Sequence, residues 1–180
     1  MFPLWGNGSG AWLRALSREL VKKGHEVAIV APESRKIEGV KHYIVKPRQM
    51  GVFVGNPELP NCKKYEEMSG VELAEIYSDY VKVTIPAVKE FQPEIVHAFH
   101  TGFLPPIARL AKVLYGILFL IMTHGSDLHY LSRDRRYIGL IKDAIRVSAL
   151  VTANSNFTRR WFLKMFGAEW SSKIRTIPGG

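Results

Sequence analysis

A continuous apolar run that ends abruptly in polar residues is the feature that most constrains this chain. It covers residues 117–127, ILFLIMTHGSD, and its apolar part shows no alternation with polar residues. Such a run is typical of a strand buried on both faces of a parallel sheet. Ligands bind beyond the carboxyl ends of strands in open α/β sheets, so the polar end predicts a functional edge. The alternative is an ordinary Gly-Ser turn, with His124 packed against a neighbour.

Strand and helix patterns alternate along the rest of the chain. Strands are predicted over residues 25–31, 41–46, 95–99, 149–153 and 173–177, in addition to the apolar run. Helices are predicted after the glycines at 6–10 and over residues 71–91, 103–115, 134–147 and 157–166. A long irregular segment, 47–70, interrupts the alternation. The alternation predicts an α/β fold with a Rossmann-like, doubly wound parallel sheet.

Length and composition fit one domain over residues 1–180. The formal charge of +9 favours anionic partners, such as nucleic acid, an acidic membrane surface or phosphorylated small molecules. The basic residues are scattered and carry no nucleic-acid motif, so we expect no nucleic-acid partner. A single cysteine, Cys62, excludes an internal disulfide and a cysteine-based zinc site, and fits a reducing compartment.

The sequence predicts a cytoplasmic protein. Its first residues, MFPLWGNGSG, lack the basic region and apolar core of a secretory signal. The apolar stretch 113–122 is too short to span a bilayer, which needs about 20 residues. Peripheral association with the inner membrane face stays open, because the net charge would suit an anionic surface.

Three glycines near the start, Gly6, Gly8 and Gly10, precede an amphipathic helical pattern. A glycine-rich loop that leads into a helix N-terminus can bind an anion through its backbone N–H groups. The spacing is neither GxGxxG nor a P-loop, so a flexible loop before the helix is an equal alternative. Only MFPLW precedes the loop, so the first strand of the sheet is largely missing.

Three strand ends would meet at one edge of the predicted sheet. They carry residues 6–10, residues 100–102 with His100, and residues 124–127 with His124 and Asp127. This convergence is the residue-level argument for a site at that edge.

The motifs together resemble a known family. GNGSGAWLRALSRELVKKGHEVAIVAP, PEIVHAFH, MTHGSD, VTANSNFTRR and KIRTIPGG occur in the order found in the N-terminal domain of GT-B glycosyltransferases. The chain resembles retaining glycosyltransferase family 4 (glycosyl transferase group 1) over essentially its whole length. The resemblance implies transfer of a sugar, of the hexosyltransferase type, from a nucleotide-sugar donor to a glycan, lipid or small-molecule acceptor in carbohydrate biosynthesis. It implies no metal or other cofactor.

The resemblance also assigns roles to residues. It implies that Gly6, Gly8, Ser9 and Gly10 face the donor phosphates, with Gly8 and Gly10 closest. It places His124 near the transferred sugar and makes Asp127 an acceptor-side hydrogen-bond partner; His100 matches a polar position at the preceding strand end. A retaining transfer needs a stabilised leaving group and a positioned hydroxyl more than a protein nucleophile. His124 is therefore expected to orient substrate or to shuttle a proton.

The family pattern continues into a C-terminal domain that binds most of the donor, and the sequence lacks that domain. We therefore expect this chain to be the acceptor-side half of an enzyme and inactive alone, with the other half supplied in cis or by a partner chain. Two alternatives stay open. One is a non-catalytic Rossmann-like binding module. The other is an unrelated doubly wound enzyme such as an epimerase or a dehydrogenase, which the missing GxGxxG disfavours.

Overall fold

The computed structural model describes residues 4–5, 7–55 and 59–178. Contacts within the chain group it into two compact units. Unit 1 comprises residues 1–63 and 68–92, and unit 2 comprises residues 64–67 and 93–180. Whether the two units act as the single domain expected from the sequence stays a prediction.

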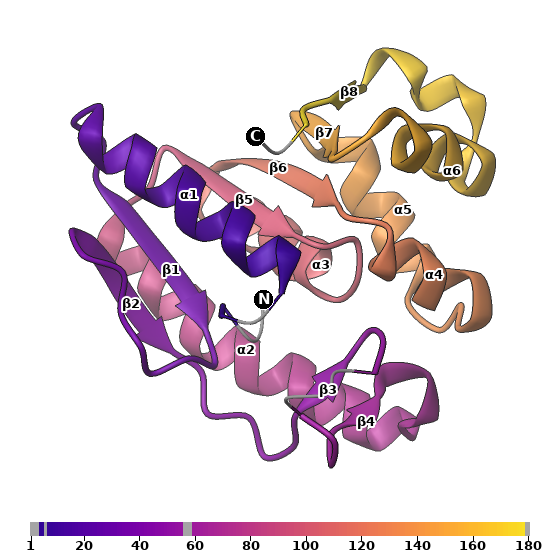
Figure 1. The fold of residues 1–180 in the computed structure, drawn as a ribbon, viewed down its shortest axis with the longest axis horizontal. Helices are drawn as coiled ribbons and strands as arrows, with labels where there is room; N and C mark the ends of the chain where they lie inside the picture. The colour runs from indigo at the N-terminus through magenta and orange to yellow at the C-terminus, as the bar shows by residue number, and fades with distance from the viewer. Residues whose placement is uncertain (1–3, 6, 56–58, 179–180) are drawn as a thin grey trace. The chain divides into compact units, whose positions relative to one another are not determined.

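Unit 1 is built on two parallel strands. β1 (Val27–Ala31) pairs with β2 (Val40–Ile44) in register from Val27↔Val40 to Ala31↔Ile44. The helices α1 (Gly8–Lys22) and α2 (Gly70–Phe91) both contact this sheet, and Figure 1 shows α2 behind it. The predicted strands and helices of this half are thus confirmed, with shifts of a few residues at their ends.

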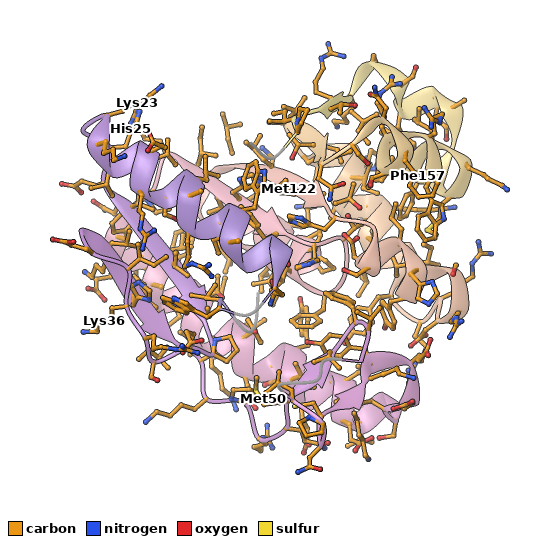
Figure 2. The ribbon with its side chains drawn as sticks, viewed as in Figure 1. Lys23, His25, Lys36, Met50, Met122 and Phe157 are labelled. Atoms are coloured by element: carbon orange, nitrogen blue, oxygen red, sulfur yellow. The ribbon has the colours of Figure 1, made fainter. Side chains whose placement is uncertain are left out.

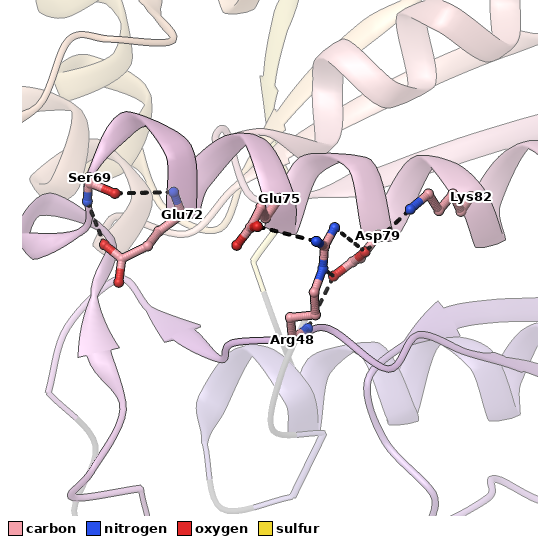
Figure 3. A network of polar contacts seen from close by, with 6 residues as sticks. All are labelled: Arg48, Ser69, Glu72, Glu75, Asp79 and Lys82. Carbon is pink, nitrogen blue, oxygen red and sulfur yellow. Dashed lines mark hydrogen bonds and ion pairs between the residues drawn. The ribbon is translucent and has the colours of Figure 1, made fainter.

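Polar contacts fix the N-terminal half of α2 and the segment that runs toward it. Ser69 and Glu72 form a capping box at its N-terminus, which satisfies N–H groups that the helix leaves free. Arg48, just after β2, bonds the carboxylates of Glu75 and Asp79 on one side of the helix (Figure 3). The segment 47–70 is therefore partly ordered. It also contains the two-residue strands β3 (Gly51–Val52) and β4 (Lys63–Lys64), which pair with each other.

Unit 2 is a four-stranded parallel sheet with the order β5-β6-β7-β8. The apolar run forms β6, which is flanked by β5 and β7, so both of its edges are paired. The side chains of Phe119, Ile121, Val151 and Ile174 are almost completely buried. The strands are β5 (Ile95–Phe99), β6 (Leu118–Thr123), β7 (Leu150–Ala153) and β8 (Ile174–Thr176).

The connections of unit 2 are helical, as the alternating pattern predicts. The helices are α3 (Leu104–Tyr115), α4 (Ser126–Arg133), α5 (Ile138–Val147) and α6 (Asn156–Phe166), with the short helix η2 (Ala168–Ser172) before β8. α4 was not expected. The helix predicted over 134–147 begins at Ile138, and a separate helix occupies the residues directly after His124 and Gly125.

A short piece of the irregular segment belongs to unit 2. Its helix η1 (Tyr65–Glu67) places the Tyr65 ring edge-on to Phe103 and Tyr130, with centroids 5.5 and 6.0 Å apart. Arg136 donates to the Tyr65 carbonyl and pairs with the buried carboxylate of Asp134. These contacts attach residues 64–67 to the helical side of unit 2.

The topology confirms the Rossmann-like α/β class. The strands β1 and β2 of unit 1 are parallel, and so are the four strands β5-β6-β7-β8 of unit 2. Helices connect the successive parallel strands of unit 2, which is typical of this class. None of the described residues before Gly8 forms a strand.

Candidate active site

The polar residues that follow β5 and β6 are brought together by one carboxylate. Asp127 lies in the first turn of α4 and is completely buried. Its Oδ2 accepts the backbone N–H of Thr101 at 2.6 Å, and its Oδ1 accepts the N–H groups of His124 and Gly125 at 3.1 and 2.8 Å. The carboxylate therefore joins the loop after β5 to the loop after β6, across 26 residues of sequence.

The backbone around this carboxylate has special conformations. Gly125 has φ +100°, a region that favours glycine, and this bend lets successive N–H groups face Oδ1. His100 has φ +82°, which is rare for a residue with a side chain and costs about 1–2 kcal/mol. Its N–H still bonds Met122 O at 2.8 Å, so the strand pairing continues through the bend.

Asp127 has backbone partners that the sequence analysis did not predict. The sequence analysis made it a hydrogen-bond partner for the acceptor; in the structure both of its oxygens accept backbone N–H groups. The structure thus gives Asp127 a role in holding backbone, and a direct substrate contact stays an untested prediction.

The imidazoles of His100 and His124 lie against each other at this edge. Their ring centroids are 4.7 Å apart, and the ring of Phe99 stacks 5.7 Å from His124. Burial lowers the pKa of both histidines, and for His124 it outweighs the nearby Asp127 carboxylate, which acts in the opposite direction. Both rings are therefore neutral at pH 7, and each neutral imidazole offers one donor and one acceptor.

The charge of Asp127 is set by its backbone partners and by the histidines. Burial alone would raise its pKa, but the His100 imidazole in its protonated form and the N–H groups of Thr101 and His124 hold the pKa below its ordinary value. Asp127 is therefore ionised at neutral pH. A buried carboxylate that accepts several N–H groups is a stable arrangement, because each donor lowers the cost of burying the charge.

The end of β7 joins the same network. The Asn154 side-chain amide donates to the His124 carbonyl at 3.2 Å, and the Thr158 hydroxyl donates to Asn154 Oδ1 at 2.7 Å. Ser155 caps α6 by accepting from the Thr158 N–H. The sequence analysis missed Thr101 and the Asn154 amide as members of the network; their only signal was their position just after a strand.

Several polar atoms at this edge have no partner among the residues that the structure describes. They are His124 Nε2 and the hydroxyls of Thr101 and Thr123, all buried. Buried polar groups are nearly always hydrogen-bonded in native proteins, so each of these calls for a ligand or a water molecule. These atoms lie at the carboxyl ends of β5 and β6, where α/β proteins bind ligands.

The glycines near the start lie in unit 1. Gly8, Ser9 and Gly10 form the first turn of α1, so they are helical and do not form the loop that was expected. Asn7 caps this turn: its Oδ1 accepts the Gly10 N–H at 2.6 Å and the Ser9 hydroxyl at 3.0 Å. Gly6 lies outside the described residues. A role for these positions in binding donor phosphates stays a prediction.

Among the described residues, no group of three or more His, Cys, Asp or Glu side chains is arranged to hold a metal ion. In the same part of the chain, no helix has the length and apolar content needed to cross a bilayer.

The fold and the site define an α/β protein with a candidate ligand-binding edge at the carboxyl ends of β5 and β6. The family model for Glycosyltransferase Family 4 matches residues 6–180. The chain belongs to this family, which confirms the resemblance drawn from its motifs. No curated protein matches the chain.

Proposed function

We propose that this chain is the acceptor-side part of a retaining glycosyltransferase that transfers a hexose from a nucleotide sugar to an acceptor. The observation that carries the proposal is the neutral, partly buried His124. Its backbone N–H is bonded to Asp127, its carbonyl is bonded to Asn154, and its Nε2 has no partner within the described chain. Family membership supports sugar transfer in general, and the held imidazole supports His124 as the residue that meets the substrate.

A fixed, neutral imidazole suits this chemistry. It can accept a hydrogen bond from a sugar hydroxyl, or donate one, without adding a charge near the reacting centre. Retaining transfer requires the acceptor hydroxyl to be positioned against the donor sugar while the leaving phosphate is stabilised. We assign the positioning of a sugar hydroxyl to His124. The proposal includes a second domain that holds most of the donor, supplied by the same chain or by a partner.

Replacing His124 is the direct test. In the complete enzyme, with a donor and an acceptor found by screening nucleotide sugars against candidate acceptors, we expect His124→Ala to lower kcat about 10²-fold, the usual cost of losing one positioned hydrogen bond to the transition state. Release of the nucleoside diphosphate measures turnover. His129→Ala is the matched control, because His129 lies five residues away on α4 and should leave kcat within about twofold. An unchanged kcat for His124→Ala would exclude this role.

The same reaction tests the stereochemistry and the absence of a metal. We expect the first product to keep the anomeric configuration of the donor, as seen by proton NMR before mutarotation. We also expect the rate to be unaffected by excess EDTA, because helix N-termini and basic side chains can stabilise the leaving phosphate. An inverted product would refute the retaining assignment, and a rate restored only by a divalent cation would refute the metal-free one.

A peripheral membrane location belongs to the proposal on the ground of charge. The excess of 25 basic over 16 acidic residues would favour an anionic leaflet and a lipid-linked acceptor.

A further inference from the structure

Two arginines of unit 1 converge on one tryptophan ring. The guanidinium carbon of Arg14, on α1, lies 5.1 Å from the ring centroid of Trp5. That of Arg35, in the segment between β1 and β2, lies 4.8 Å from the same centroid. Both distances are within the range of cation–π attraction, which holds the two cations beside the ring in spite of their mutual repulsion. This arginine cluster, comprising Trp5, Arg14 and Arg35, lies where β1 ends and α1 begins.

The positive charge of the cluster is only partly balanced. Glu33 is buried, accepts the Arg35 N–H at 3.1 Å and lies 3.6 Å from Arg35 Nε. No carboxylate within the described chain pairs with Arg14, and its Nη1 is buried with no acceptor. Lys36, which follows Arg35 in the sequence, is exposed (Figure 2). Of the two guanidinium groups, only that of Arg35 therefore has a carboxylate partner among the described residues.

An unpaired buried guanidinium nitrogen is costly, and an oxyanion would satisfy it. The planar fork of N–H groups on arginine matches the oxygens of phosphoryl and carboxylate groups better than any other side chain does. The N-terminal end of α1, with its positive dipole, adds to the attraction. The Gly10 N–H and the Ser9 hydroxyl at this helix end are already bonded to Asn7, so the free donors are those of the arginines.

We infer that the arginine cluster binds an oxyanion, a phosphoryl or carboxylate group carried by a substrate. That the group belongs to a substrate of the transfer rests on the proposed function; the anion site itself does not. The carboxyl end of β1 is the edge of this sheet at which α/β proteins hold ligands, so the cluster lies at a position suited to binding. Nothing in the family match assigns a role to Arg14 or Arg35.

Binding of a small anion by the protein itself is the first test. Inorganic phosphate is titrated while the indole N–H resonance of Trp5 is followed by ¹H–¹⁵N NMR, with Trp5→Phe identifying the signal. We expect a saturable shift that potassium chloride at equal ionic strength does not reproduce. Arg14→Gln and Arg35→Gln should each weaken binding at least about tenfold, ~1.4 kcal/mol. Arg18→Gln is the control, because Arg18 is exposed one turn further along α1 and should leave the affinity unchanged.

The outcomes separate the two parts of the inference. A shift that chloride reproduces, or one that survives both Gln variants, would overturn the anion site; the Arg35 variant guards against misfolding, because that side chain is 62% exposed. In the transfer reaction, Arg35→Gln should raise KM for the substrate that carries the oxyanion. A raised acceptor KM would assign the group to the acceptor, and a raised donor KM would assign it to the donor diphosphate. Unchanged KM values for both substrates would refute a role of the cluster in substrate binding. Phosphate binding by a protein that transfers no sugar would leave the anion site standing and refute the proposed function alone.

Discussion

Asp127→Asn should destabilise unit 2 by about 3 kcal/mol and displace His124 at the same time. The Asn side chain has one acceptor oxygen in place of two. If that oxygen still accepts hydrogen bonds from the N–H groups of His124 and Gly125, the NH₂ group of the Asn side chain must face the N–H of Thr101. Two donors then oppose each other. The bond between the loops after β5 and β6 is then lost, and a buried donor is left unsatisfied.

Urea unfolding followed by circular dichroism measures the loss of stability, and turnover of the complete enzyme measures the loss of the site. Asp143→Asn is the matched control, because Asp143 is a partly exposed carboxylate paired with Arg109 and Arg146 on the surface of unit 2. Exposed pairs contribute little, so this change should cost under about 1 kcal/mol. A stability of Asp127→Asn within 0.5 kcal/mol of the unchanged protein, on the scale typical of surface substitutions, would contradict the structural role given to this carboxylate.

Acid should destabilise unit 2 well before its carboxylates are protonated. Burial lowers the pKa of His97, His100 and His124, and that of His97 falls to about 4. In the unfolded chain each imidazole takes up a proton near pH 6.5. Below that pH the unfolded state binds more protons than the folded state, so stability is fully present above pH 6.5 and is lost as the pH falls toward the folded pKa. For His97 alone the loss between pH 7 and pH 5 is ~2 kcal/mol.

The free energy of unfolding, measured in urea at half-unit steps from pH 7.5 to pH 5, tests this slope. His97→Leu provides the comparison: it removes one titrating group whose Nε2 is buried without a partner in the described structure. We expect the free energy of unfolding of this variant to depend less steeply on pH, by the equivalent of one bound proton. We also expect the variant to be more stable than the unchanged protein at pH 5. Parallel pH profiles for the two proteins would show that folding does not lower the pKa of His97.

The sequence predicted the strands of unit 2 well, because their apolar runs leave no competing pattern. It also placed His100, His124 and Asp127 correctly at adjacent strand ends. It assigned no helix to the residues after His124, since Gly125-Ser126 has turn chemistry and the first turn of α4 has no side-chain cap from Gly125. The spacing of Leu128 and Leu131, both fully buried, was the available sign of a helix there.

The roles of individual side chains were harder to predict than their positions. The sequence shows that Asp127 follows a buried strand, but not that its oxygens face backbone N–H groups, one of them 26 residues away. That pairing depends on the conformations of two loops, including the positive φ of His100. No local sequence pattern predicts these conformations. The arginine cluster is a similar case, because Arg14 and Arg35 meet only through the folded path from α1 to β1.

Asp127 binds backbone amides, which every residue except proline possesses, and it makes no demand on the side chains of the residues that it holds. The framework of this edge is therefore separable from its chemistry. Side chains at positions 101 and 124 can be exchanged while the loops keep their path, whereas Gly125 and Asp127 cannot. The side chains that contact a ligand at this edge can therefore be changed, by evolution or by engineering, without a change of fold.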